Sequence, residues 1–242
     1  MTNLLEVRDL GKNFGGVRAL HGVDLTVNAG EVVGIMGANG AGKTTLFALI
    51  AGNLKPSAGD IRLNGTSIVG LSPDKICRRG VGRTFQTARP FVDMTVQENV
   101  TTAARFGMDR LDTQGAAKRA AHLLDIVGLG ARRNHLAGDL TLSGQKRLEV
   151  ARSVATGARL LLLDEVMAGL TPTEVVQMLD VVQTLKAEIA LTVLIIEHVM
   201  RALMRISDRI LVLHHGEPIA LDVPAEIAKD QRVLDCYLGT HA

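Results

Sequence analysis

The sequence is poor in cysteine and contains no long hydrophobic run. Its two cysteines, Cys77 and Cys236, lie far apart and match no metal-binding spacing, which suggests a reducing compartment. The longest strongly apolar run, residues 189–196, is bounded by Glu188 and Glu197. That run is too short to cross a bilayer, which needs about 20 residues. We therefore expect a soluble cytosolic domain.

The sequence also lacks a large excess of positive or negative charge. Lys and Arg total 27 against 25 Asp and Glu, a net charge of +2. Nucleic acid is not an expected partner, because proteins that bind it usually concentrate excess positive charge on one face. Residues 1–6 lack the basic, apolar and small-residue series of a signal peptide, and we expect none. With 242 residues, 47% of them hydrophobic, the chain can bury the core of one large or two small domains.

Apolar strands and helical patterns alternate along most of the chain. Segments that are almost wholly apolar, typical of strands buried in a parallel sheet, occur at residues 32–36, 160–163 and 191–196. Between residues 94 and 158 the spacing is helical, with a capping box at Thr95 and Glu98 and a helix expected to run to Arg110. We expect a final helix from Pro224 to Leu238. The pattern predicts a helical subdomain inserted into an α/β core.

A glycine-rich segment, G-A-N-G-A-G-K-T, follows the first apolar strand at residues 37–44. It matches the strand–GxxxxGK[ST]–helix pattern of a phosphate-binding P-loop. Glycines let successive N–H groups converge on phosphate oxygens, and the following helix adds its positive dipole end. In this motif Lys43 reaches the β- and γ-phosphates and the Thr44 hydroxyl ligates Mg²⁺. The predicted phosphate-binding residues are Gly37, Asn39, Gly40, Ala41, Gly42, Lys43, Thr44 and Thr45.

An acidic pair, Asp164 and Glu165, follows the apolar segment 160–163. A carboxylate at the end of an apolar strand is costly unless it faces a cation or water, and ligands of parallel sheets bind at the carboxyl ends of the strands. We predict that Asp164 holds Mg²⁺, through water, and that Glu165 is the general base for the attacking water. Without the P-loop, the pair would as readily be the plain end of a strand.

Three further features narrow the class of P-loop protein. Phe14 precedes the P-loop, Gln86 ends the segment V-G-R-T-F-Q, and His198 ends I-I-E-H. In this order, together with the P-loop and the acidic pair, they resemble the ATP-binding cassette (ABC) ATPases over nearly the whole chain. The resemblance implies that Phe14 stacks on the adenine of ATP, that Gln86 senses Mg²⁺ and the lytic water, and that His198 contacts the γ-phosphate.

The resemblance also implies the fold. It predicts an α/β, P-loop (RecA-like) parallel-sheet core over residues 1–89 and 159–242, with an N-terminal antiparallel β subdomain. A helical signature subdomain over residues 90–158 would be inserted into this core, and the whole chain would form a single ABC ATPase domain.

The signature segment departs from the family pattern. The family usually carries L-S-G-G-Q at a helix start, whereas residues 140–149 read L-T-L-S-G-Q-K-R-L-E. In one register a glycine is lost and Ser143 and Gly144 keep their places. In the other, which we prefer, Thr141 stands at the usual serine, because a one-residue slip would rotate the following helix by roughly 100°. Thr141 and Ser143 thus both remain candidates for the hydroxyl that meets the γ-phosphate bound by a partner cassette.

Several stretches resemble one branch of the family, the branched-chain amino-acid importer ATPases. They are residues 13–16, 83–86, 94–100, 168–172, 196–198 and 237–239. The branch implies a peripheral subunit on the cytoplasmic face of the cell membrane, paired with a second cassette, identical or paralogous. It also implies transmembrane permease subunits docking near Gln86 to Val100 and, indirectly, a solute-binding protein. The alternatives are a lipid or lipopolysaccharide exporter ATPase and, more remotely, a non-transport ABC ATPase.

Overall fold

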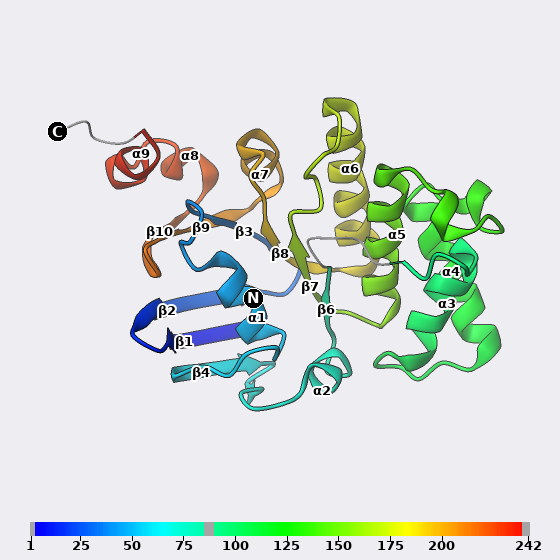
Figure 1. The fold of residues 1–242 in the computed structure, drawn as a ribbon, viewed down its shortest axis with the longest axis horizontal. Coiled ribbons are helices and arrows are strands. Elements are labelled where there is room, and N and C mark those ends of the chain that lie inside the picture. Colours follow the sequence, from blue (N-terminus) through cyan, green and yellow to red (C-terminus); the bar gives the residue numbers. More distant parts are fainter. Residues whose placement is uncertain (1–2, 85–89, 239–242) are drawn as a thin grey trace. The chain divides into compact units, whose positions relative to one another are not determined.

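The computed structural model describes residues 3–84 and 90–238, which divide into two compact units (Figure 1). Unit 1 comprises Met1–Ile76 and Val193–Ala242, and unit 2 comprises Cys77–Thr192. The bounds of the helical subdomain, residues 90–158, stay a prediction.

Unit 1 contains an antiparallel sheet near its N-terminus. Its strands follow the order β2-β1-β4-β5, with the bounds β1 Asn3–Phe14, β2 Val17–Asn28, β4 Ala58–Leu63 and β5 Thr66–Ser67. Alternating residues of β2 are buried, from Val23 to Val27, as the alternating sequence predicts for a sheet with one covered face. The turn at Gly15 and Gly16 joins β1 to β2.

The parallel strands of unit 1 carry the predicted phosphate-binding segment. The central strand β3, Val32–Met36, lies between β8, Thr192–Ile196, and β9, Arg209–His214, and β10, Glu217–Asp222, pairs with β9 antiparallel. Every residue of β3 and β8 is buried. Ile35 pairs with Ile196, so the two strands end side by side. The helices of this unit are α1 Lys43–Ile50, α2 Pro73–Cys77, α7 Met200–Ile206, α8 Pro224–Ile227 and α9 Gln231–Leu238.

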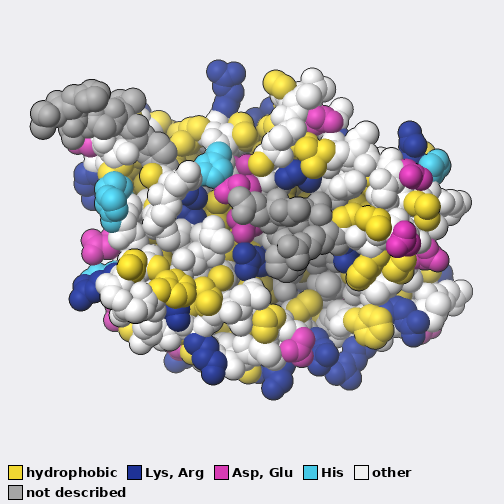
Figure 2. Space-filling view, in the orientation of Figure 1, with side chains coloured by type: hydrophobic (Ala, Val, Ile, Leu, Met, Phe, Trp, Pro, Cys, Tyr) yellow, Lys and Arg dark blue, Asp and Glu magenta, His cyan; other side chains and the backbone are white. Residues whose placement is uncertain are grey.

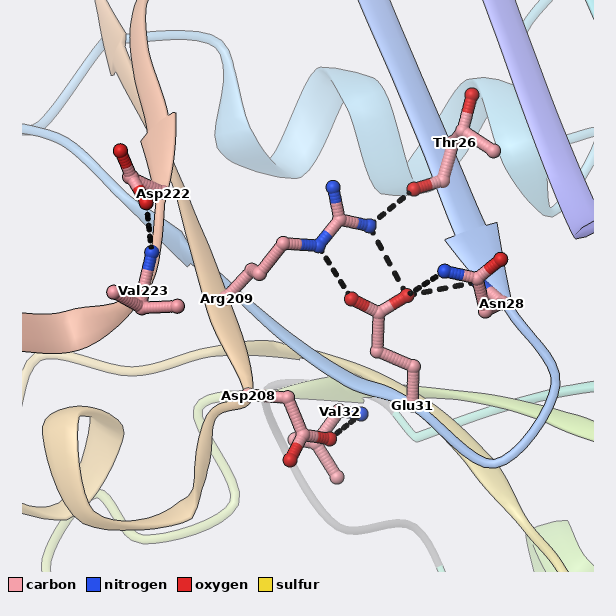
Figure 3. A network of polar contacts seen from close by, with 8 residues as sticks. All are labelled: Thr26, Asn28, Glu31, Val32, Asp208, Arg209, Asp222 and Val223. Carbon is pink, nitrogen blue, oxygen red and sulfur yellow. Dashed lines mark hydrogen bonds and ion pairs between the residues drawn. The ribbon is translucent and has the colours of Figure 1, made fainter. Parts of the chain in front are cut away.

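A polar network joins the opposite ends of these strands, where β3 and β9 begin (Figure 3). Arg209 donates from Nε to Glu31 Oε1 at 2.5 Å and from Nη2 to Glu31 Oε2 at 3.0 Å. The same Nη2 reaches the Thr26 carbonyl at 2.7 Å. Asp208 Oδ2 accepts the N–H of Val32 at 2.8 Å. The carboxylates of Glu31 and Asp208 thus hold the backbone in place where β3 and β9 begin.

Unit 2 is mainly helical. Its two parallel strands are β6, Val81–Arg83, and β7, Leu160–Asp164. Helices α3, α4 and α5 contact one another (Figure 1). The helices and short 3₁₀ turns are α3 Val96–Phe106, α4 Thr113–Ile126, η1 Gly130–Arg132, η2 Ala137–Asp139, α5 Leu142–Ala155 and α6 Pro172–Ile189.

Two expected helices have different bounds. The helix from Thr95 ends at Phe106 rather than Arg110, because the chain at Gly107 turns extended against α5; a Cβ there would stand 2.2 Å from the Thr156 carbonyl oxygen. The expected final helix is two helices, α8 and α9. Asp230 separates them: its carboxylate accepts the N–H of Arg232 at 2.9 Å, as a helix-capping residue does.

Candidate functional site

The glycine-rich segment connects β3 to α1 in a conformation that glycine allows. Gly37 has φ +155°, and a Cβ there would stand 2.4 Å from the carbonyl oxygen of Leu213. Gly42 is left-handed, with φ +99°, and a Cβ would stand 2.7 Å from the carbonyl oxygen of Ala19. Around Gly40, at φ +81°, the space is open. Two glycines are therefore required by close packing, whereas Gly40 borders free space.

Helix α1 presents its N-terminus to this segment. Its first backbone hydrogen bond runs from the Leu46 N–H to the Gly42 carbonyl, and within the described chain no side chain caps the helix. An N-terminus of this kind offers backbone N–H groups and a positive dipole end to an anion. The segment therefore fits a phosphate group.

The side chains of the segment complete that fit. Lys43 is only 7% exposed, and its Nζ donates to the carbonyl oxygens of Gly37 at 2.6 Å and Ala38 at 3.0 Å. The ammonium group thus stays inside the loop. Thr44 is exposed, and its hydroxyl oxygen is the kind of ligand that Mg²⁺ takes. Of the other predicted residues, Asn39 is exposed, Thr45 half-buried and Ala41 buried.

Two more predicted residues belong to unit 1. His198 is exposed and lies just beyond β8, after the buried Glu197. Because β3 and β8 are parallel neighbours, His198 and the glycine-rich segment both follow strand ends at one edge of the sheet. Phe14 ends β1 with 46% of its surface exposed, and Lys12 Nζ lies 5.0 Å from its ring centroid.

Asp164 is the last residue of β7 in unit 2. It is 3% exposed, and its carboxylate accepts a hydrogen bond from Arg83 Nη2 at 3.1 Å. Its backbone N–H donates to the Thr84 hydroxyl at 3.0 Å. Sequence reasoning did not identify Arg83 and Thr84 as partners of Asp164. One signal could have identified Arg83 and Thr84: they directly precede Phe85 and Gln86 in the chain. Gln86 itself lies outside the described residues.

Glu165 follows in the left-handed region, at φ +52°, and is half-buried. A non-glycine residue is strained there and needs support from its surroundings. Lys146 Nζ donates to the Glu165 carbonyl oxygen at 3.1 Å. This contact, too, was not predicted from the sequence.

The signature segment forms the start of α5. Thr141 is the N-cap, and its hydroxyl accepts the N–H of Gly144 at 3.3 Å. Ser143 lies inside the first turn and is 6% exposed. Glu174 closes the capping box of α6, where the N–H and hydroxyl of Thr171 lower the pKa of its carboxyl group. A cavity of about 290 Å³ borders Thr141, Ser143 and Gly144.

Among the described residues, no three His, Cys, Asp or Glu side chains gather into a site for a metal ion. No helix in the same part of the chain is long and apolar enough to cross a membrane.

A glycine loop between a buried parallel strand and an uncapped helix defines a P-loop nucleotide-binding protein. The chain belongs to the ABC transporter family, whose model matches residues 20–168, and it is an ABC ATPase. The predicted α/β P-loop fold, with its N-terminal antiparallel strands, is confirmed.

Three known proteins illustrate the relationship. The high-affinity branched-chain amino acid transport ATP-binding protein BraF of Pseudomonas aeruginosa is 41% identical over 98% of both chains. The crystal structure of MJ1267, an ATP-binding cassette of an ABC transporter in its ADP conformation, has a TM-score of 0.88 and 28% identity, over 99% of this chain and 100% of that one. A dimeric post-hydrolysis structure of the cassette MJ0796, bound to ADP and Pi, has a TM-score of 0.80 and 25% identity, over 91% and 98%.

Proposed function

We propose that the chain is the ATP-hydrolysing subunit of an ABC importer for branched-chain or related amino acids. The observation that carries this proposal is the 41% identity to BraF over 98% of both chains. That relative is a transport ATP-binding protein for branched-chain amino acids, which favours import over the exporter and the non-transport alternatives. The protein would work as a peripheral subunit on the cytoplasmic face of the cell membrane.

In the proposed reaction, unit 1 binds the nucleotide. The N–H groups from Gly37 to Thr45 hold the phosphates, Lys43 neutralises the β- and γ-phosphates, and Phe14 stacks on adenine. Thr44, Asp164 and Gln86 would hold Mg²⁺, which when bound offsets charge on the phosphates. Glu165 accepts a proton from the attacking water, and His198 donates a hydrogen bond to the γ-phosphate.

A second cassette would complete each site. The start of α5, with Thr141 as its N-cap, would meet the γ-phosphate on another cassette through its hydroxyl and its N–H groups. The N-cap position of Thr141 supports the register that places it at the usual serine, since Ser143 lies inside the first turn and is only 6% exposed. The dimeric structure of MJ0796 supports pairing of this kind. ATP would close the pair, and hydrolysis would reopen it.

The permease subunits would dock beside Gln86 to Val100. In the described part of this segment, Phe91 is 48% and Val92 51% exposed. Leu136, 46% exposed, lies alongside, because the following N–H of Ala137 donates to the Met94 carbonyl. Figure 2 shows hydrophobic side chains gathered over the helical region of unit 2. Exposed apolar side chains in a group favour a protein partner.

The experiment is to replace Glu165 by Gln. Turnover should fall about 100-fold or more, because the amide cannot accept the proton. MgATP binding should remain, and the ATP-bound dimer should accumulate. Phosphate release, calorimetry and size-exclusion chromatography measure the three quantities. The matched control is Glu188→Gln, an exposed carboxylate on α6 in the same unit. Undiminished hydrolysis in Glu165→Gln would remove Glu165 from the role of general base.

A further inference from the structure

Glu165, which carries the proposed catalytic carboxylate, has a backbone conformation that is unfavourable for any residue other than glycine. Glu165 has φ +52°, in the left-handed region, although it carries a Cβ. The direction of its Cα–Cβ bond, and with it the position of the carboxylate, depends on keeping this conformation. Strain of this kind persists only where neighbouring groups fix the backbone.

Two groups donate to the carbonyl oxygen of Glu165: the N–H of Ala168, at 3.2 Å, and the side chain of Lys146. Lys146 belongs to the first part of α5 and is 6% exposed. A buried ammonium group requires hydrogen-bond acceptors, and Nζ donates to the carbonyl oxygen of Glu165 at 3.1 Å. The direction of that carbonyl is set by the ψ angle of Glu165, so the hydrogen bond restrains the torsion next to the carboxylate-bearing Cα.

The start of α5 contacts the chain after Glu165 at one further point. Gly169 packs against Leu142, so closely that a Cβ on the glycine would stand 3.2 Å from Leu142 Cδ2. Leu142 and Lys146, one turn apart on α5, therefore contact the chain at Gly169 and at Glu165.

We propose that Lys146 is a positioning residue for Glu165, and that it links the signature segment to the general base of the same chain. This inference rests on the proposed function, in which Glu165 is the base and Thr141 meets the nucleotide of another cassette. In a closed pair, the α5 start of one chain would touch one ATP while the Glu165 of that chain serves the other. A shift of α5 on closure would then reach Glu165 through the Lys146 hydrogen bond.

The test compares Lys146→Met with Lys146→Arg. Methionine fills the space but cannot donate, so kcat should fall about 10- to 100-fold, as expected for a misplaced catalytic group. KM for MgATP should change less than about threefold, because the P-loop is untouched. Arginine keeps a donor and should restore most of kcat. Lys118→Met, an exposed lysine on α4, is the control and should match the wild type.

Dimer formation separates positioning from a defect in the signature itself. If Lys146 acts through Glu165, Lys146→Met still closes with MgATP and accumulates as an ATP-bound dimer, because only hydrolysis is slowed. A variant that neither dimerises nor hydrolyses ATP would overturn the inference, since Lys146 would then be needed for the helix start. If Lys146→Met does not fold, Lys146→Leu, which likewise cannot donate a hydrogen bond, replaces it with the same expectations.

The Glu165→Gln variant keeps this test distinct from that of the proposed function. Loss of turnover in Glu165→Gln with normal kcat in Lys146→Met would overturn the positioning role alone. Normal turnover in Glu165→Gln would overturn the assignment of the base, and the positioning role with it.

Discussion

Gly37 illustrates how a single residue can be required for two reasons. Its φ of +155° favours glycine, and its missing side chain lets the Leu213 carbonyl approach the loop. A sequence motif predicts the glycine but does not identify the carbonyl behind it, because Leu213 is far away in the chain. The same limit applies to Arg83 and Lys146, whose long-range contacts with Asp164 and Glu165 follow only from the fold.

Replacing Gly37 by Ala should lower the free energy of unfolding by about 1–3 kcal/mol, because the strained backbone and the Leu213 carbonyl both oppose a Cβ. Urea unfolding measures the change. The control is Gly65→Ala, where φ is +74° but a Cβ would meet nothing within 4 Å. Equal losses for the two variants would show that the contact with Leu213 contributes nothing.

At the scale of elements, local signals in the sequence predicted the buried strands β3, β7 and β8 and several helix starts. The capping boxes at Thr95 and Thr171 both begin helices, α3 and α6. Strand β4 was not predicted. It contains Gly59, where a Cβ would stand 2.3 Å from the Asp9 carbonyl oxygen on β1. Because β4 is determined by its close contact with β1, which is distant in the sequence, its own residues show little strand pattern.

The capping box of α3 predicts an acid-sensitive contribution to stability. The N–H and hydroxyl of Thr95 hold the pKa of Glu98 below its ordinary value of 4.5. A lowered pKa means that the stabilisation is fully present above pH 4.5 and is lost as pH falls through the lowered value. Glu98→Gln should therefore unfold more easily than the wild type at pH 7, and the two should converge in acid. Urea titrations from pH 7 to pH 3 measure this; a difference independent of pH would contradict it.

At the scale of the molecule, family and fold class were predictable because the motifs recur in a fixed order along one chain. The order of Phe14, the P-loop, Gln86, the acidic pair and His198 indicated an ABC ATPase, and the family model and relatives confirm the family. The structure divides the residues of the proposed site between its two units: the P-loop and His198 belong to unit 1, and Asp164 and Glu165 to unit 2.

Nucleotide binding should stabilise the folded protein against heat. MgATP should raise Tm, because a ligand that binds only the folded state shifts unfolding by mass action. ATP with EDTA should raise Tm less, since Thr44 and Asp164 would then have no cation to share with the phosphates. Differential scanning fluorimetry measures both shifts, and Lys43→Ala should remove most of the MgATP effect. Equal shifts with and without magnesium would contradict a role for the metal.

The ion pair between Arg209 and Glu31 anchors the parallel strands of unit 1 at the end where they start, while the glycine-rich loop follows the other end (Figure 3). Because the ion pair and the loop lie at opposite ends of the same strands, a substitution at Glu31 would weaken the sheet without touching any residue of the loop.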